Sequence, residues 1–386
     1  MRQPAATVDP WHDSYDYEDL WRLYRQMRDR PPVFSERHGG YWALTRYDEV
    51  RAAAADYATF SSADGVVLGL GRKQRPFVPV EVDPPDAAVY RALLQPLMTR
   101  VRLDALRPVI EARAAAMVSA ITETGTADVV AVLCEPLPVA AISALVGLDP
   151  DEAARMRELA RGIMAAAQDQ SAAALGAFQA FLTELIADRR ARPRPDQLSE
   201  IVAARIDGHL IDDDILVTLV QGLVLAGHHT SITALSFLLW RIAQGGLLSP
   251  LADPQVRAGA AQEALRLDPP IHVQGRRVLT DTIIRGSRLR AGDYALLVFA
   301  SANRDEREFP RPDHFEVRRP PHHLTFGHGV HRCLGMPLAL LEMRAVIDQI
   351  SSAWRTVRVA EAPQIRAMMW GHNVGMDRLM LTAEAR

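Results

Sequence analysis

Cysteine is scarce in this sequence: Cys134 and Cys333 are the only two among 386 residues. Because they lie far apart, they exclude a disulfide scaffold and a metal site of paired cysteines, and they favour a reducing cytosol. The sequence also lacks a run of about 18 apolar residues and an apolar N-terminal signal core, so we expect no membrane span and no secretion signal. A formal net charge of -3 gives no electrostatic reason to bind nucleic acid or an anionic membrane. We therefore expect a soluble, cytoplasmic protein.

No internal repeat or long linker divides the chain, so we predict a single domain over residues 1–386, with a flexible N-terminal segment at 1–16. Helical patterns dominate, strands are short, and no alternating βα pattern occurs, which predicts a mostly α fold with small β sheets. The predicted helices are Tyr17–Arg30, Tyr47–Asp56, Asp86–Met98, Leu103–Thr122, Leu137–Val146, Asp151–Gln168, Ser171–Ala191, Ile215–Gln244, Val256–Leu267 and Pro337–Trp354. The predicted strands are Tyr41–Thr45, Arg277–Thr280, Ile283–Ile284 and Ala295–Val298, with a closing strand pair over Ile365–Thr382.

The longest predicted helix, Ile215–Gln244, is expected at the centre of the fold, because its apolar residues go almost all the way round. Within it, Gly227 costs about 1 kcal/mol relative to alanine, and a glycine near Thr230 can open the helix locally for a small ligand. The adjacent His228 and His229 point about 100° apart, which makes them poor joint ligands of one metal ion.

Cys333 lies in a glycine-rich stretch, residues 326–335, directly before a helical pattern. Glycine serves where a backbone turns tightly or approaches a ligand closely. The neighbouring His331 and Arg332 favour the thiolate form of the cysteine, which can bind a soft metal or a haem iron. A lone cysteine is more often buried and inert. Here, however, the spacing of Phe, Gly, Gly, His, Cys and Gly makes a specific motif.

This stretch closely resembles the cysteine loop of the cytochrome P-450 family, the haem-thiolate monooxygenases, and other landmarks of that family follow in order from about Tyr17 to Leu381. The resemblance implies a cytochrome P-450 fold, in which a long central helix and the cysteine loop surround a buried haem b, with Cys333 as axial ligand of the iron. It implies further cofactor contacts at Arg91, Arg277, His323 and His331 for the propionates, at Phe326, Gly327 and Gly335 in the loop, and at Ala226 on the helix. Ala87 stands where the family often has a propionate-binding histidine. Because Arg276 is next to Arg277, either arginine could occupy the propionate position.

The resemblance also implies Thr230, His229 and Gly227 as catalytic residues, with Thr230 at the position that hydrogen-bonds dioxygen. The family usually has an acid before that threonine, whereas this sequence has His229, similar to the sterol-demethylase branch. A histidine can shuttle protons near neutral pH. The alternative is that His229 is an ordinary core histidine.

Glu263 and Arg266 lie three residues apart on one predicted helix face and can form a pair. In the resembled family such a pair joins a third basic residue in a buried structural network before the cysteine. The position that matches this third residue is His314. We therefore expect a structural role for Glu263, Arg266 and His314.

We expect an apolar substrate pocket with some polar points, bordered by the glycine- and proline-rich segment 61–82. Its expected lining residues are Val67, Leu223, Ala226, Ile271, Val273 and Trp370.

By resemblance, we expect a monooxygenase that uses dioxygen to oxidise a small, largely apolar organic substrate, as in secondary metabolism. Electrons would come from a separate ferredoxin with an NAD(P)H-dependent reductase, docked by Arg100, Arg102 and Arg332 on a protein expected to be monomeric. One alternative is a cytochrome P-450-type peroxygenase or oxidative-coupling enzyme, which the missing acid at His229 would suit. Another is a non-enzymatic haem-binding sensor, although we find no signalling or DNA-binding segment.

Overall fold

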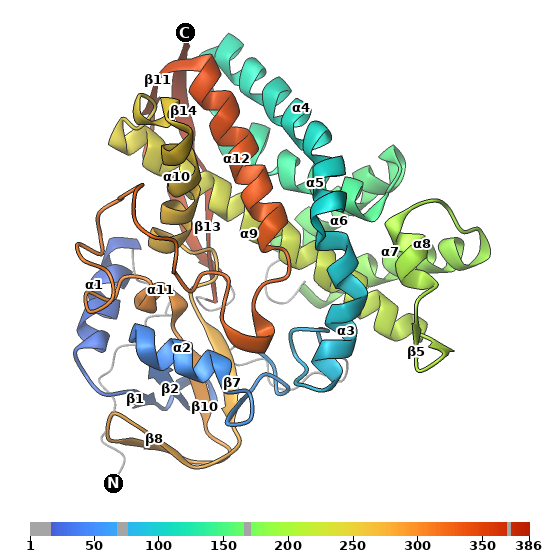
Figure 1. Ribbon diagram of the computed structural model, residues 1–386, viewed down its shortest axis with the longest axis vertical. Helices are drawn as coiled ribbons and strands as arrows, with labels where there is room; N and C mark the ends of the chain where they lie inside the picture. Colours follow the sequence, from blue (N-terminus) through green and yellow to red (C-terminus); the bar gives the residue numbers. More distant parts are fainter. Residues whose placement is uncertain (1–16, 68–75, 166–170, 369–371) are drawn as a thin grey trace.

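The computed structural model describes residues 17–67, 76–165, 171–368 and 372–386 (Figure 1). The described helices are α1 Tyr17–Arg28, α2 Tyr47–Ala55, α3 Asp86–Leu94, α4 Arg100–Thr124, α5 Pro136–Val146, α6 Pro150–Ala165, α7 Ser171–Ala191, α8 Gln197–Val202, α9 Asp213–Gly245, α10 Pro254–Leu267, α11 Phe299–Ala302 and α12 Met336–Ala353. The described strands are β1 Val33–Ser35, β2 Tyr41–Leu44, β3 Phe60–Ser61, β4 Thr126–Asp128, β5 Arg205–Ile206, β6 His209–Leu210, β7 Gln274–Val278, β8 Thr282–Ile284, β9 Ser287–Leu289, β10 Tyr294–Leu297, β11 Trp354–Val359, β12 Gln364–Met368, β13 Asn373–Arg378 and β14 Met380–Ala385.

The largest described sheet has the strand order β1-β2-β10-β7-β3. Strands β10 and β2 run parallel, whereas the other neighbours are antiparallel, and Ala295 is paired with both Trp42 and Arg276. This sheet and helices α1 and α2 gather at one end of the molecule, and the long helices α4, α9 and α12 fill the other (Figure 1). Smaller sheets are β11-β14-β4, β12-β13, β5-β6 and β8-β9.

Helix α9 spans 33 residues and forms the centre of the helical part. It packs against α5, α7, α10 and α12, and most of its side chains from Leu216 to Ala243 are buried. By length and composition alone α9 could cross a membrane, but 61% of its apolar stretch is buried inside the protein. We therefore interpret it as a core helix.

The structure confirms a mostly helical fold with small sheets and a long central helix. Helix α7 has the predicted bounds, and α9 exceeds its predicted range by two residues at its start and one at its end. The closing strand pair is only partly correct, because β12 pairs with β13 whereas β14 joins the separate sheet with β11 and β4. The predicted N-terminal segment 1–16 lies outside the described residues.

Candidate functional site

The cysteine loop is a tight turn that only glycine allows at two positions. Gly327 and Gly329 have φ angles of 68° and 72°, which side chains rarely adopt. A Cβ atom on Gly329 would also come within 2.8 Å of the main-chain oxygen of Ala54 in α2. The Cys333 amide donates to the oxygen of Phe326 at 2.7 Å, which closes the loop and fixes the direction of the cysteine.

The Cys333 thiol lies deep in the protein but keeps an accessible surface. Burial raises the pKa of Cys333, while the amides of Gly335 and Met336 and the charges of Arg91 and Arg332 oppose that rise. Because α12 begins at Met336, the sulfur faces amides at the start of a helix, where the helix dipole favours an anion. The amides and the arginines thus favour the thiolate form. Because burial disfavours its negative charge, the thiolate would be stabilised by a cation or a metal ion.

Two arginines near this loop lack an anionic partner among the described side chains. Burial lowers the pKa of Arg91, the charge of Cys333 opposes that fall, and the Arg91 guanidinium has no hydrogen-bond acceptor in the described part of the chain. Arg276 in β7 is 3% exposed, and burial lowers its pKa to about 10. It donates to the oxygen of Gly275 at 2.7 Å but forms no ion pair with any described carboxylate. Arg276 is buried and Arg91 is half-buried, and cations without a carboxylate partner in such positions fit an acidic ligand.

Arg277, the predicted propionate residue of β7, is instead engaged by protein groups. Its guanidinium donates to Asp64 at 2.8 Å and to the Gly292 oxygen at 2.7 Å, and about a third of the side chain is exposed. The alternation of side chains along β7 therefore makes Arg276 the buried cation.

The predicted histidines of the loop region are also held by protein partners. His331 lies 3.2 Å from Ser62 Oγ and 3.5 Å from Asp83 Oδ1. Burial would raise the pKa of Asp83, but hydrogen bonds from His331, Ser61 and Ser62 hold it well below its usual range. His323 lies 2.8 Å from Gln262, and burial lowers its pKa to about 3, so it is neutral at pH 7.

One face of α9 is accessible although the helix runs through the core. Ala226 is exposed, and Leu223, Gly227 and Thr230 are half-buried, at spacings that place them together on the helix. An accessible face on a central helix indicates an internal space beside it. That space, the accessible Cys333 sulfur and the two arginines without a described carboxylate partner, Arg276 buried and Arg91 half-buried, fit a large acidic group that carries a thiolate-binding metal.

The predicted local opening of α9 at Gly227 is not present, because the helix continues without interruption from Asp213 to Gly245. Thr230 Oγ1 donates to the oxygen of Ala226 at 2.7 Å. A Cβ atom on Gly227 would come within 3.3 Å of Ile142 in α5. The glycine thus lets α5 and α9 pack closely.

His229 is held neutral on the side of α9 next to Thr230. Burial is the main cause that lowers its pKa to about 4, and the nearby His228, Arg366 and His372 contribute to this fall. Its Nδ1 atom is buried and has no hydrogen-bond partner in the structure described. An imidazole that stays neutral at pH 7 lacks the proton that an acid at this position would carry.

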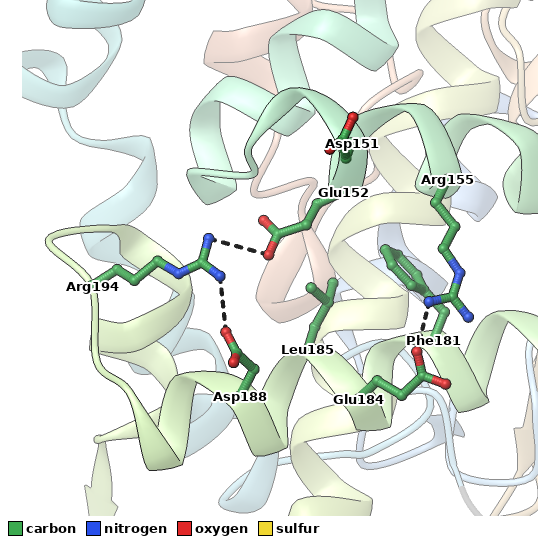
Figure 2. A pocket seen from close by; sticks show the side chains of 8 residues that line it. All are labelled: Asp151, Glu152, Arg155, Phe181, Glu184, Leu185, Asp188 and Arg194. Atoms are coloured by element: carbon green, nitrogen blue, oxygen red, sulfur yellow. Dashed lines mark hydrogen bonds and ion pairs between the residues drawn. The ribbon is translucent and has the colours of Figure 1, made fainter.

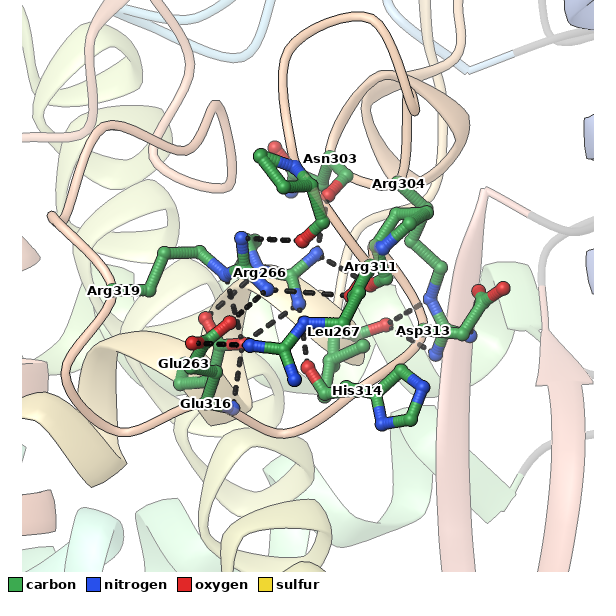
Figure 3. Close-up of polar contacts among 12 residues, drawn as sticks. Glu263, Arg266, Leu267, Asn303, Arg304, Arg311, Asp313, His314, Glu316 and Arg319 are labelled. Atoms are coloured by element: carbon green, nitrogen blue, oxygen red, sulfur yellow. Dashed lines mark hydrogen bonds and ion pairs between the residues drawn. The ribbon is translucent and has the colours of Figure 1, made fainter.

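Glu263 and Arg266 form the predicted buried pair, which Figure 3 shows within a larger network. Arg266 donates to both Glu263 oxygens, at 2.8 Å and 2.7 Å. The third basic side chain is Arg319, whose Nε lies 3.1 Å from Glu263 Oε1. The prediction of His314 is wrong, because its side chain is exposed and only its main-chain oxygen accepts a bond from Arg266. The loop brings Arg319 back to α10, which sequence spacing alone did not reveal.

Only some of the expected pocket residues lie on the accessible face of α9. Leu223 and Ala226 lie on it, as described above. Val273 is 1% exposed and packs in a core cluster with Tyr24 and Tyr41, so its assignment to the pocket is wrong. Val67 is buried and Ile271 is half-buried, and Trp370 lies outside the described residues.

A hollow of about 300 Å³ between α6 and α7 is not the predicted pocket. Figure 2 shows that it is crossed by ion pairs, with Arg155 bonded to Glu184 at 2.6 Å and Arg194 bonded to Asp188 at 2.9 Å. The charged side chains that line the hollow are thus paired or solvated. We interpret them as ion pairs that join α6 and α7.

Comparisons with known proteins give a consistent result. A sequence profile described as cytochrome P-450 matches residues 259–356. The chain is 32% identical over 360 residues to the cyclomarin C epoxidase CymV of Salinispora arenicola, covering 89% of this chain and 91% of the relative. It is 33% identical over 351 residues to a steroid C26-monooxygenase of Mycobacterium tuberculosis, covering 87% and 86%. Among solved structures, the cytochrome P-450 PksS of Bacillus subtilis superposes with a TM-score of 0.88 at 25% identity, covering 98% and 100%.

Proposed function

The chain belongs to the cytochrome P-450 family, and from that premise we propose that it is a monooxygenase of a small, largely apolar organic substrate. The observation that carries the proposal is Cys333, held in a glycine turn with helix amides and arginines around its sulfur. The accessible face of α9 supplies an apolar surface for substrate through Leu223 and Ala226. We take residues 1–386 as one catalytic domain.

We infer haem b as the cofactor. Cys333 would bind its iron, and Arg91, Arg276 and His331 would face its carboxylates. When bound, the haem supplies the redox chemistry that activates dioxygen. The chain's own contribution is to hold the thiolate with the Gly335 and Met336 amides and to keep the His229 imidazole neutral.

We propose a separate ferredoxin with its NAD(P)H-dependent reductase as electron source, and a soluble, cytoplasmic, monomeric enzyme. Arg332 is exposed beside Cys333 and is the strongest candidate for a residue that binds the acidic surface of the electron donor. Arg102 is a weaker candidate, because it donates twice to Glu200 at 2.7 Å and 2.9 Å.

A visible spectrum of the reduced protein with carbon monoxide tests the proposed function. The wild type should give the red-shifted band of a thiolate-bound haem, and Cys333→Ala should lose that band completely, because no other described cysteine is accessible. Cys134→Ala is the matched control and should keep the band. A wild type without the band would end the proposal.

Haem retention tests the assignment of Arg276. Arg276→Gln should weaken haem binding about tenfold, the scale of one buried charge-assisted hydrogen bond. Arg277→Gln, next to it in β7, should change retention little, because Arg277 already pairs with Asp64. Transfer of haem to apomyoglobin measures both. Faster loss from Arg277→Gln than from Arg276→Gln would reverse the assignment.

A peroxygenase or oxidative-coupling enzyme is the second candidate, and the neutral His229 favours it, because that side of α9 lacks a described acid. Peroxide and the ferredoxin system should be compared with the same substrate panel. Turnover with peroxide, and none with dioxygen and ferredoxin, would establish this candidate in place of the first.

A further inference from the structure

The Asp83 carboxylate lies where three elements of the candidate site meet. Its Oδ1 accepts from the Ser62 amide at 3.1 Å and from the Ser62 hydroxyl at 3.0 Å, and its Oδ2 accepts from the Ser61 hydroxyl. The Nε2 atom of His331 lies 3.5 Å from the same Oδ1. One carboxylate thus joins the end of β3, the segment that leads into α3, and the cysteine loop.

Two of the joined elements carry the arginines that have no described carboxylate partner. The main-chain oxygen of Asp83 accepts from the Ala87 amide at 3.1 Å in the first turn of α3, and Arg91 follows one turn later on the same helix face. Ser61 belongs to β3, which pairs with β7, the strand that contains Arg276. The positions of both arginines therefore depend on elements that Asp83 joins.

The third element presents His331, whose ring is held from one side only. Its Nε2 atom contacts Ser62 Oγ at 3.2 Å and faces Asp83, whereas its Nδ1 atom forms no hydrogen bond within the described part of the chain. A carboxylate next to one imidazole nitrogen fixes the ring orientation and leaves the other nitrogen for a ligand. Ala87 is 1% exposed and has no donor in its side chain, so α3 supplies no histidine at that position.

Asp83 acts on this group of cations without pairing with the arginines. Hydrogen bonds from the protein hold its pKa well below the usual range, so the carboxylate is ionised at pH 7. Burial is the main influence on the pKa of Arg276 and lowers it, whereas Tyr294 and Asp83 oppose that fall. No ion pair joins Asp83 to Arg91 or Arg276 in the structure described, because serine donors and His331 occupy its oxygens. The arginines therefore stay available to an acidic ligand.

We propose that Asp83 is a positioning residue that sets Arg91, Arg276 and His331 in one arrangement for the carboxylates of the cofactor. The proposal rests on the proposed function, because the ligand is the haem inferred above. Asp83 acts through the side chains and elements that it joins, and its own oxygens stay bonded to protein donors.

Replacing Asp83 has two opposite effects on an acidic ligand. Removal of a negative charge near cations strengthens the binding of an anion, whereas loss of the acceptor releases His331 and the two serine hydroxyls. Asparagine keeps the shape of the side chain but turns an amide donor towards groups that are themselves donors. Because protein donors fill the carboxylate oxygens, we expect the loss of position to dominate. The expected effect is about tenfold, the lower end of the range for removing a partner that orients a ligating histidine.

Binding of metal-free protoporphyrin IX and of its dimethyl ester to the haem-free full chain tests the proposal. The two probes share one ring, but the ester lacks charged carboxylates, and neither probe contains iron for Cys333. Porphyrin fluorescence gives both dissociation constants, and their ratio measures the preference for the diacid. This preference should fall about tenfold in Asp83→Asn, while the affinity for the ester changes little. A merely structural loss would weaken both probes equally and leave the ratio unchanged.

Two further variants make the test specific. Asp86→Asn is the matched control and should keep the ratio, because Asp86 is exposed in the first turn of α3. Ser62→Ala should lower the ratio about threefold, the scale of one neutral hydrogen bond, and it keeps the test valid if Asp83→Asn folds poorly. Circular dichroism first checks that each variant is folded. An unchanged ratio in folded Asp83→Asn or Ser62→Ala, or a higher ratio in Asp83→Asn, would overturn the proposal.

The outcomes separate this inference from the proposed function. The carbon monoxide band of the reduced holoenzyme is recorded for the wild type and for each variant. Wild type without the band refutes the monooxygenase, whatever the porphyrin ratio. Wild type with the band, together with an unchanged ratio in Asp83→Asn, refutes the role of Asp83 alone.

Discussion

Replacing Arg266 with leucine should lower the free energy of unfolding by about 3–5 kcal/mol, the range for removing one partner of a buried ion pair. The Arg266 guanidinium is fully enclosed, and it donates to Glu263 and to the main-chain oxygens of Asn303 and Pro312. Without it, the Glu263 carboxylate stays buried with Arg319 as its remaining cation, and the carbonyl groups of three residues, His314 included, lose a donor. Urea unfolding followed by circular dichroism measures the change.

The matched variants of this network are Arg319→Leu and His314→Ala. Arg319→Leu should cost about 1.5–3 kcal/mol, because it removes one charge-assisted hydrogen bond to Glu263. His314→Ala should stay within about 0.5 kcal/mol of wild type, since its side chain is exposed. A larger loss from His314→Ala than from Arg319→Leu would show that the third member of the network is assigned wrongly.

The sequence predicts only part of this network. Glu263 and Arg266 are close in sequence on one helix, so their pairing follows from helix geometry. Arg319 reaches Glu263 because residues 316–319 fold back over α10, where the oxygen of Val317 occupies the space of a Cβ on Gly259. That return depends on tertiary packing, and a sequence pattern carries no signal for it.

The same limit applies to the choice between Arg276 and Arg277. The predicted strand begins at Arg277, whereas β7 begins at Gln274 and contains both arginines. Alternation along a strand places one of them inside and one outside, but the sequence pattern does not say which. Pairing with β10 sets the register, and Arg276 becomes the buried residue. Short elements such as α8 and β4 lie outside the predicted elements, because they are shorter than the stretch needed to recognise a periodic pattern, about 11 residues for a helix and about 4 for a strand.

Glu342 in α12 belongs to none of the predicted motifs, and its effect on stability comes from its burial alone. Glu342→Gln should change stability by less than about 1 kcal/mol near pH 5 and should stabilise the protein by about 4 kcal/mol near pH 8. The amide has nearly the same shape as the protonated acid, so the packing between α9 and α12 is kept. What the variant removes is the ionisation of a group that has no partner for its charge.

The direction follows from proton binding. Burial raises the pKa of Glu342 to about 8, from an ordinary value of 4.5 that the unfolded chain regains. Between these values the folded protein holds a proton that the unfolded chain has released, so wild-type stability falls as pH rises and levels off above about pH 8. The difference in unfolding free energy between wild type and Glu342→Gln, measured in urea from about pH 5 to pH 8, isolates this term from all other titrating groups. A difference independent of pH would mean that Glu342 is already ionised in the folded protein, which would contradict the predicted effect on stability.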